Sequence, residues 1–373
     1  MSPSADQIVA DVAEVLYLEP ADLDHQLDLR DQGMDSVRIM ELADRWRQNG
    51  AGEVSFILLA EDRRLERWIE LVGGPAREPE DPAQRFRTVM ATVSLGGTLV
   101  EKLDAIAAAG FDGIELLDSD LRDAPVSAAQ VAARCADLGL TIDLYQPFRR
   151  AEGVSDAEFP DVLERFRREL DVMAELGATS ILVVSNTDDD ADPSPDRSAE
   201  QLCALADTAA AHGMTVTYEA LAWGTHIGRV AEARDVVRRA AHPALSLTVD
   251  TFHLASRGDG SDVLGGITAD ELGLIQVADA PWRSMDLVQW SRNHRCFPGE
   301  GEFDLAGPLA VLLAAGYRGP LSLEIFNPEL RALPPHEVAA RGAGALDTLV
   351  ADLGGTTGAG AGAVRDPALR GSG

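Results

Sequence analysis

The sequence predicts an α/β fold: a (β/α)₈ TIM barrel preceded by a small all-α domain. Eight short apolar runs alternate with alanine-rich amphipathic stretches over residues 86–353, the pattern of a parallel sheet covered by helices. No GxGxxG motif follows the first run, so a dinucleotide-binding sheet lacks its main support. We therefore expect a closed barrel with its site at the carboxyl ends of the strands.

The chain of 373 residues divides into four segments by composition. Residues 1–74 are acidic and helix-patterned, and residues 75–85 are rich in proline, glycine and charge, as is typical of a linker. The barrel is expected over residues 86–353. The glycine-rich tail of residues 354–373 is expected to be disordered.

The eight expected strands, in chain order, are residues 88–95, 113–118, 141–148, 180–186, 215–221, 245–253, 272–280 and 320–327. Expected helices between them include residues 99–110, 128–139, 161–177, 199–213 and 304–316. Each of these helices ends at a glycine, which readily adopts the left-handed conformation found at helix C-termini.

Composition excludes several classes of function. The formal net charge is −30, and Lys102 is the one lysine among 32 basic residues. Such an acidic surface repels phosphate polymers, so neither nucleic acid nor an anionic membrane is expected as a partner.

The three cysteines show no paired spacing, and the N-terminus lacks the basic and apolar regions of a signal peptide. We expect a cytoplasmic protein without a membrane span, and homo-oligomerisation is compatible with its sequence.

Residues 28–42, DLRDQGMDSVRIMEL, contain an Asp-Ser pair that is expected to begin a helix. A serine at a helix N-terminus is exposed, and the helix end favours a phosphate group there. The apolar residues Val37, Met40 and Leu42 follow in a helical pattern. The stretch resembles the acyl and aryl carrier proteins, four-helix domains, and is more similar to the aryl carriers of siderophore-type pathways. The resemblance implies that Ser36 carries 4′-phosphopantetheine; the alternative is a serine that only caps its helix.

Four polar residues interrupt or end expected strands five to eight: Glu219, Asp250, Gln276 and Glu324. Adjacent strands of a barrel bring such residues around one point. Three carboxylates at one point repel each other unless a cation neutralises them. Carboxylate and amide oxygens suit Mg²⁺ or Mn²⁺, with Co²⁺ as a further candidate. Taken singly, each residue could instead cap a helix or face solvent.

With this ligand set the barrel resembles the xylose-isomerase-like superfamily, in which histidine is common where this chain has Gln276. Within it, the runs YEALAWG, DTFHLASRGD, QVADAP and QWSRNHRCFPGEGEFDL resemble bacterial 3-dehydroshikimate dehydratases over residues 86–330. The resemblance implies dehydration of 3-dehydroshikimate to protocatechuate (3,4-dihydroxybenzoate). It also implies that Arg149, Ser291 and Arg295 bind the substrate. In the run FRRAEG, Arg150 stands where the resemblance leads us to expect an acidic residue after the first arginine. The role of Arg150 therefore stays open.

The expected chemistry is removal of a proton beside a ketone, followed by loss of a hydroxyl group. A cation that binds the ketone and a neighbouring hydroxyl would stabilise the enediolate. His253, one helical turn after Asp250, is the expected acid/base, because imidazole titrates near neutral pH. Glu219 is the second expected catalytic residue. The alternative for His253 is a structural role.

The two parts together suggest one pathway, in siderophore or other secondary-metabolite biosynthesis. The barrel would supply 3,4-dihydroxybenzoate, and the arm on Ser36 would hold it as an aryl thioester. A phosphopantetheinyl transferase, an aryl-adenylating enzyme and a condensing enzyme are expected to act in trans. Three alternatives stay open: another sugar or polyol isomerase, epimerase or dehydratase; a non-catalytic barrel that is a scaffold for the carrier; and a nuclease of the endonuclease-IV type, which the net charge disfavours.

Overall fold

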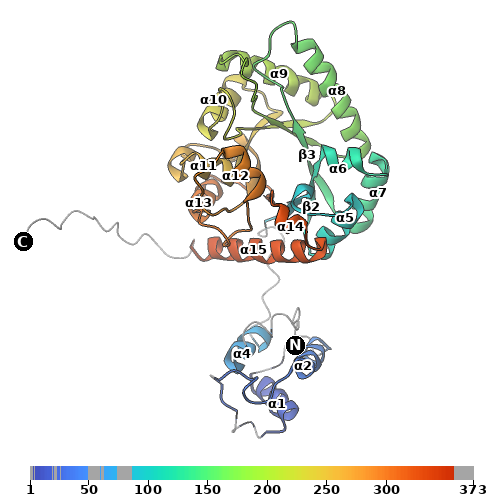
Figure 1. The fold of residues 1–373 in the computed structure, drawn as a ribbon, viewed down its shortest axis with the longest axis vertical. Helices are drawn as coiled ribbons and strands as arrows, with labels where there is room; N and C mark the ends of the chain where they lie inside the picture. The colour runs from blue at the N-terminus through green and yellow to red at the C-terminus, as the bar shows by residue number, and fades with distance from the viewer. Residues whose placement is uncertain are drawn as a thin grey trace, which may run out of the picture. The chain divides into compact units, whose positions relative to one another are not determined.

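The computed structural model divides into two compact units, Met1–Arg85 and Phe86–Gly373 (Figure 1). It describes residues 86–356 and, in the first unit, residues 3, 5–18, 20, 23–25, 27–48, 59 and 63–73. The predicted linker, residues 75–85, lies outside the described residues, as does the predicted tail beyond Thr356. Each unit is described by itself.

The described part of the first unit is helical, as predicted. Its helices are α1 (Ala5–Leu16), α2 (Ser36–Gln48) and α4 (Leu65–Gly73). Their apolar faces bury Trp46 and Trp68, whose rings meet edge to face with centroids 6.0 Å apart. Both indole N–H groups are satisfied: Trp46 donates to Asp11 Oδ2 at 2.7 Å and Trp68 to the Leu59 carbonyl at 2.9 Å. The unit therefore has its own core, as an independently folding domain requires.

Eight parallel strands close into a barrel in chain order, which confirms the predicted TIM barrel. The strands are β1 (Thr88–Ala91), β2 (Gly113–Leu117), β3 (Thr141–Phe148), β4 (Ser180–Val184), β5 (Thr215–Glu219), β6 (Leu245–Asp250), β7 (Leu272–Val277) and β8 (Leu321–Leu323). β1 pairs with β8 to close the barrel. Each observed strand lies within the run predicted for it. The run predicted over 245–253 was too long, because Asp250 caps a helix and so ends β6.

Helices surround the barrel (Figure 1). The longer ones are α5 (Leu99–Ala108), α7 (Ala128–Leu138), α8 (Phe159–Leu176), α9 (Pro195–Ala211), α10 (Val230–Ala240), α13 (Ala306–Ala314) and α15 (Pro335–Thr356). Gly139 and Gly177 follow α7 and α8 with φ of 73° and 70°, the left-handed ends that the sequence predicted. α15 continues to Thr356, three residues beyond the predicted end of the barrel.

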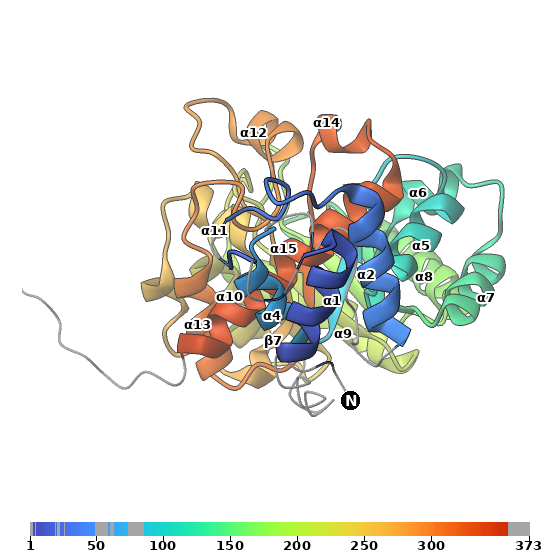
Figure 2. The ribbon, with the colours of Figure 1, turned by 90° about the horizontal axis from the view of Figure 1, so that it is seen from below.

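Short helices follow the carboxyl ends of several strands. They are α6 (Asp118–Asp123), α11 (Thr251–Ser256), α12 (Leu287–Asn293) and α14 (Pro328–Arg331). Figure 2 shows α12 and α14 at the same end of the barrel. Among the helices of the described residues, none is both long and apolar enough to cross a bilayer.

Three leucines of the barrel interior lie beneath the polar residues: Leu144, Leu182 and Leu274. They belong to one apolar cluster with Val184 and Leu221, which line the pocket above. Residues two apart share a strand face, so Leu144 points to the same side of the sheet as Gln146, and Leu274 to the same side as Gln276. The polar residues are thus one layer closer to the carboxyl ends of the strands, where barrel enzymes place their chemistry.

Candidate active site

Six polar side chains from six strands or strand ends meet, buried, at the carboxyl end of the barrel. They are Glu115, Gln146, Glu219, Asp250, Gln276 and Glu324. The pairing of β6 with β7 sets Asp250 beside Gln276. The structure therefore brings together the four residues that the sequence predicted as metal ligands, and it adds Glu115 and Gln146.

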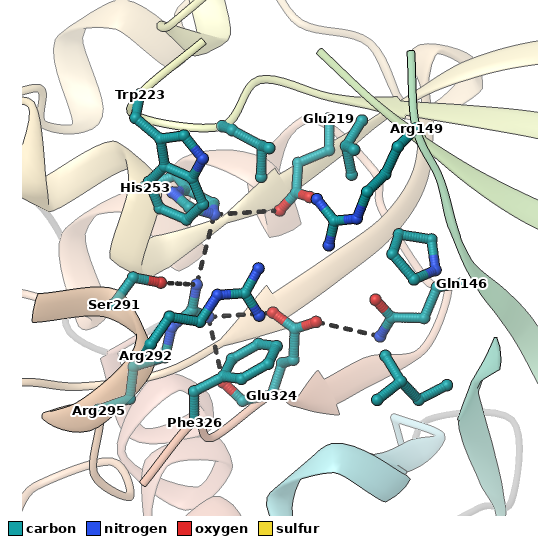
Figure 3. Close-up of a pocket in the computed structure, with 14 residues that line it drawn as sticks. Gln146, Arg149, Glu219, Trp223, His253, Ser291, Arg292, Arg295, Glu324 and Phe326 are labelled. Carbon is teal, nitrogen blue, oxygen red and sulfur yellow. Dashed lines mark hydrogen bonds and ion pairs between the residues drawn. The ribbon is translucent and has the colours of Figure 1, made fainter. Parts of the chain in front are cut away.

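The Arg295 guanidinium lies among these carboxylates, 1% exposed (Figure 3). Its Nη1 donates to Asp250 Oδ2 at 2.7 Å and to Glu324 Oε2 at 3.1 Å. Its Nη2 donates to Ser291 Oγ at 3.1 Å. Two of the three residues predicted to bind substrate, Ser291 and Arg295, are thus hydrogen-bonded to each other, and Arg295 also neutralises the acids.

The buried carboxyl groups differ in their affinity for a proton. Burial would raise the pKa of Asp250, but Arg295 and His253 outweigh it and hold that pKa below its usual value. Burial, and then the charge of Asp250, raise the pKa of Glu219 well above its usual value. Burial also raises the pKa of Glu324, although Arg295 opposes it. Arg295 alone therefore does not compensate all the negative charge that this site can hold.

Two oxygen atoms mark where further positive charge would fit. Glu219 Oε1 and Gln276 Oε1 are buried and have no hydrogen-bond partner within the described residues. Buried polar atoms in proteins are nearly always bonded. Glu219, Asp250 and His253 each offer one potential metal-ligand atom, and these three atoms all lie within 4.8 Å of one another. A site with oxygen donors of this kind fits a hard divalent cation such as Mg²⁺ or Mn²⁺.

His253 faces the same acids through one ring nitrogen. Its Nδ1 accepts from the Ala222 backbone N–H at 3.1 Å, and its Nε2 lies 3.7 Å from Glu219 Oε1 and 3.8 Å from Asp250 Oδ2. Burial lowers the pKa of His253 to about 3, so the ring is neutral at neutral pH. A neutral imidazole whose Nδ1 accepts carries its proton on Nε2. The nitrogen of the predicted acid/base faces Glu219 and Asp250, and it also lies 3.3 Å from Arg295 Nη2, which can only donate.

Cationic and aromatic side chains line the pocket above the carboxylates. Arg149 and Arg292 line it together with Trp223 and Phe326, and Figure 3 shows Arg149 beside Glu219. The Arg292 guanidinium lies 4.4 Å from the Phe326 ring centroid and 5.9 Å from that of Trp223, which holds it by cation–π contact. Arg150, in contrast, pairs with Asp188 at 2.6 Å. An anion would therefore meet positive charge here even though the chain as a whole is acidic.

The sequence analysis missed Glu115, Gln146 and Arg292. Glu115 and Gln146 each interrupt an apolar run, in GIELLD and TIDLYQPF. This criterion found the residues on strands five to eight, and applied to strands two and three it finds both. No sequence feature separates Arg292 from the other arginines, because its role depends on the rings that α12 brings beside it.

Replacement of Arg295 by methionine is expected to destabilise the metal-free protein by about 3–5 kcal/mol, because it leaves Asp250 and Glu324 buried without their counter-ion. Urea denaturation with a chelator present measures this. Arg239→Met is the matched control: it removes surface ion pairs to Asp235 and Asp196, and such exposed pairs contribute little to stability. Equal stability losses in the two variants would show that Arg295 is not what compensates the buried acids.

Comparison with known proteins adds the following. The family model described as xylose isomerase-like TIM barrel matches residues 103–349, and that of the phosphopantetheine attachment site matches residues 6–72. The chain is 48% identical over 254 residues to the 3-dehydroshikimate dehydratase of Pseudomonas putida, which covers 68% of this chain and 40% of that protein. It therefore spans about two fifths of the length of this relative.

Two further similarities concern the barrel and the first unit separately. A solved xylose isomerase-like TIM barrel/4-hydroxyphenylpyruvate dioxygenase fusion protein matches with a TM-score of 0.71 and 45% identity, over 72% of this chain and 43% of that chain. The isochorismatase of Bacillus subtilis is 45% identical over 69 residues, 18% of this chain and 22% of that protein.

Proposed function

This chain belongs to the xylose isomerase-like TIM barrel family, and on that premise we propose that its barrel dehydrates 3-dehydroshikimate to protocatechuate. The observation that carries the proposal is a pocket with arginines at its opening and carboxylates at its base. 3-Dehydroshikimate has a carboxylate at one end and a ketone beside a hydroxyl group at the other. The 48% identity of the barrel to a 3-dehydroshikimate dehydratase supports the same substrate.

The oxygen ligands would come from Glu219, Asp250, Gln276 and Glu324, which fit Mg²⁺, Mn²⁺ or Co²⁺. A cation held there supplies Lewis acidity that stabilises negative charge on the substrate oxygens. Arg149, Ser291 and Arg295 remain the proposed substrate-binding residues, and we add Arg292. Arginine suits this role because its planar guanidinium can bind a carboxylate through two hydrogen bonds.

Glu219 and His253 are the proposed proton-transfer residues. Glu219 Oε1 is free to accept the proton from the carbon between the ketone and the carbon that bears the leaving hydroxyl. The Nε2–H of His253 is placed to hydrogen-bond that hydroxyl, and the proton taken by Glu219 passes to it, so that it departs as water. The ring then tautomerises: its methylene carbon loses a proton and the ketone oxygen gains one, which yields the aromatic product. One water molecule is released for each substrate molecule.

The test is protocatechuate formation by the purified full chain. The protein is first stripped with a chelator and then given 3-dehydroshikimate with Mg²⁺, Mn²⁺, Co²⁺ or no added metal. Product that depends on added cation, identified by its catechol absorbance and its mass, is the expected result. No product with any of the three cations would overturn the dehydratase assignment. A panel of sugars and polyols run in parallel would then test for isomerase, epimerase or other dehydratase activity.

Arg149→Met is expected to raise the KM for 3-dehydroshikimate by about 10–100-fold, with a smaller change in kcat, because a charged hydrogen bond to the substrate carboxylate is lost. Steady-state kinetics with saturating metal measure both constants. Arg150→Met is the matched control, since Arg150 pairs with Asp188 and does not line the pocket. A KM that rises equally in both variants would contradict the assignment of Arg149 to the substrate carboxylate.

For the first unit, which matches the phosphopantetheine attachment family, we propose Ser36 as the attachment site. A phosphopantetheinyl transferase would add the arm, and an aryl-adenylating enzyme would load protocatechuate onto it for a condensing enzyme. The barrel would act on the free acid, because a thioester no longer presents the carboxylate that the arginines bind. We place these steps in the cytoplasm, which three free cysteines in the barrel favour. The similarity to isochorismatase supports a siderophore-type pathway.

A further inference from the structure

Glu115 is a fully buried carboxylate to which the proposed reaction assigns no step. It points from β2 into the barrel interior and is 0% exposed. Its Oε2 accepts two hydrogen bonds, from Gln146 Nε2 at 2.8 Å and from Gln276 Nε2 at 2.7 Å. Two amides, from β3 and β7, thus turn their donor ends towards one carboxyl oxygen.

This arrangement fixes which way the Gln276 amide faces. Glu115 Oε2 accepts from the Gln276 NH₂ group, so the nitrogen end of that amide points towards Glu115 whether or not the carboxyl group is ionised. The carbonyl oxygen of Gln276 then points away from Glu115, and it is a buried oxygen without a hydrogen-bond partner in the described part of the chain. That oxygen is the atom of a glutamine side chain that a divalent cation binds.

The same carboxylate also acts on a second residue of the proposed ligand set. Gln146 Nε2, bonded to Glu115, donates in addition to Glu324 Oε1 at 3.0 Å. The other oxygen of Glu324 accepts from Arg295. Glu324 is therefore held from both sides, on one side by Arg295 and on the other by the chain that starts at Glu115. Figure 3 shows the Gln146–Glu324 contact.

We propose that Glu115 is a positioning residue for the divalent cation: it orients the Gln276 amide so that its oxygen faces the cation and, through Gln146, it holds Glu324. The inference rests on the proposed function only in that a cation binds here. Groups that orient metal ligands contribute measurably to affinity, and their loss commonly weakens binding by about 10–100-fold.

The experiment measures Mn²⁺ binding by the full chain without substrate, from the electron paramagnetic resonance of the free ion. Glu115→Leu removes the acceptor, and its Kd for Mn²⁺ is expected to rise by at least about 10-fold. Glu115→Gln cannot ionise either, but its carbonyl oxygen can accept both hydrogen bonds, so its Kd is expected to stay within about threefold of the wild-type value. The difference between the variants isolates the hydrogen-bond acceptor from the charge.

Glu152→Gln is the control for loss of a buried acid elsewhere in the barrel. Glu152 is also 0% exposed, and it accepts from Ser198 Oγ at 2.6 Å and from Tyr218 Oη at 3.0 Å, but has no contact with the glutamines. Its Kd for Mn²⁺ is expected to be unchanged. If Glu115→Leu does not fold, Gln146→Leu provides the second test, since it breaks the contact to Glu324 and should also weaken binding.

The outcomes separate this inference from the proposed function. Wild-type affinity in Glu115→Leu, or equal weakening in Glu115→Gln and Glu115→Leu, would overturn the positioning role while cation binding stands. Absence of Mn²⁺ binding in the wild-type chain would overturn both the inference and the proposed ligand set. Dehydration of 3-dehydroshikimate is measured separately and does not enter this test.

Discussion

Replacement of Glu219 by glutamine is expected to lower kcat/KM for 3-dehydroshikimate by at least about 10³-fold, or roughly 4 kcal/mol of transition-state stabilisation. The substitution changes one oxygen to an NH₂ group and keeps the size of the side chain. It removes a proposed ligand and the proposed proton acceptor together. Steady-state kinetics with saturating Mn²⁺ measure the loss. Glu164→Gln, on an exposed face of α8, is the control and is expected to leave both constants unchanged.

The same substitution should not weaken the fold, which separates loss of chemistry from loss of structure. Burial raises the pKa of Glu219, so the folded barrel binds its proton more tightly than the unfolded chain does. Ionisation of Glu219 therefore destabilises the metal-free protein as pH rises above about 4.3, the usual glutamate pKa. Glu219→Gln is expected to be at least as stable as wild type at neutral pH in a chelator. A variant that loses activity only because it unfolds would contradict the assignment.

Two of the alternatives left open by the sequence make different demands on this pocket. A neutral sugar or polyol does not need the cationic side chains of Arg149 and Arg292 at the opening. A non-catalytic scaffold does not need the buried oxygens of Glu219 and Gln276 that have no hydrogen-bond partner among the described residues, because each of them costs free energy to bury. The dehydratase proposal uses both features.

The barrel was predictable because its pattern is local. Apolar runs of strand length and glycines such as Gly139 and Gly177 at helix ends report the backbone conformation of their own neighbourhood. The strand ends show the limit, since the runs predicted over 88–95, 245–253 and 320–327 all extend beyond the observed strands. After β6, the Asp250 carboxylate accepts from the backbone N–H groups of Phe252 and His253 and begins α11.

The site was predictable only in part, for the opposite reason. Glu219 and Asp250 stand out because a carboxylate in an apolar strand needs a partner. Which partner it meets is set by the fold. The sequence does not show that Arg295, 45 residues after Asp250, lies against it, nor that Glu115 faces amides from two other strands. Contacts at such separations depend on barrel closure, which no local pattern encodes.

Ser36→Ala is expected to abolish phosphopantetheine transfer completely while leaving the fold and the barrel reaction intact. The transferase needs the serine hydroxyl, and alanine has none. The alternative role of Ser36, capping α2, is already performed by its neighbour: Asp35 Oδ1 accepts from the backbone N–H groups of Val37 at 3.1 Å and Arg38 at 2.9 Å. An aspartate in this position is a strong helix cap. Loss of the serine should therefore cost the helix little.

The measurement is the intact mass after incubation with coenzyme A and a phosphopantetheinyl transferase, alongside the rate of protocatechuate formation. Wild type and the control Ser55→Ala should each gain one phosphopantetheine, and Ser36→Ala none. All three should dehydrate free substrate at the same rate, because the two units have separate cores. A modified Ser36→Ala protein would place the arm elsewhere. A slower dehydration rate in Ser36→Ala would instead mean that the carrier takes part in the barrel reaction, and that the substrate is not only the free acid.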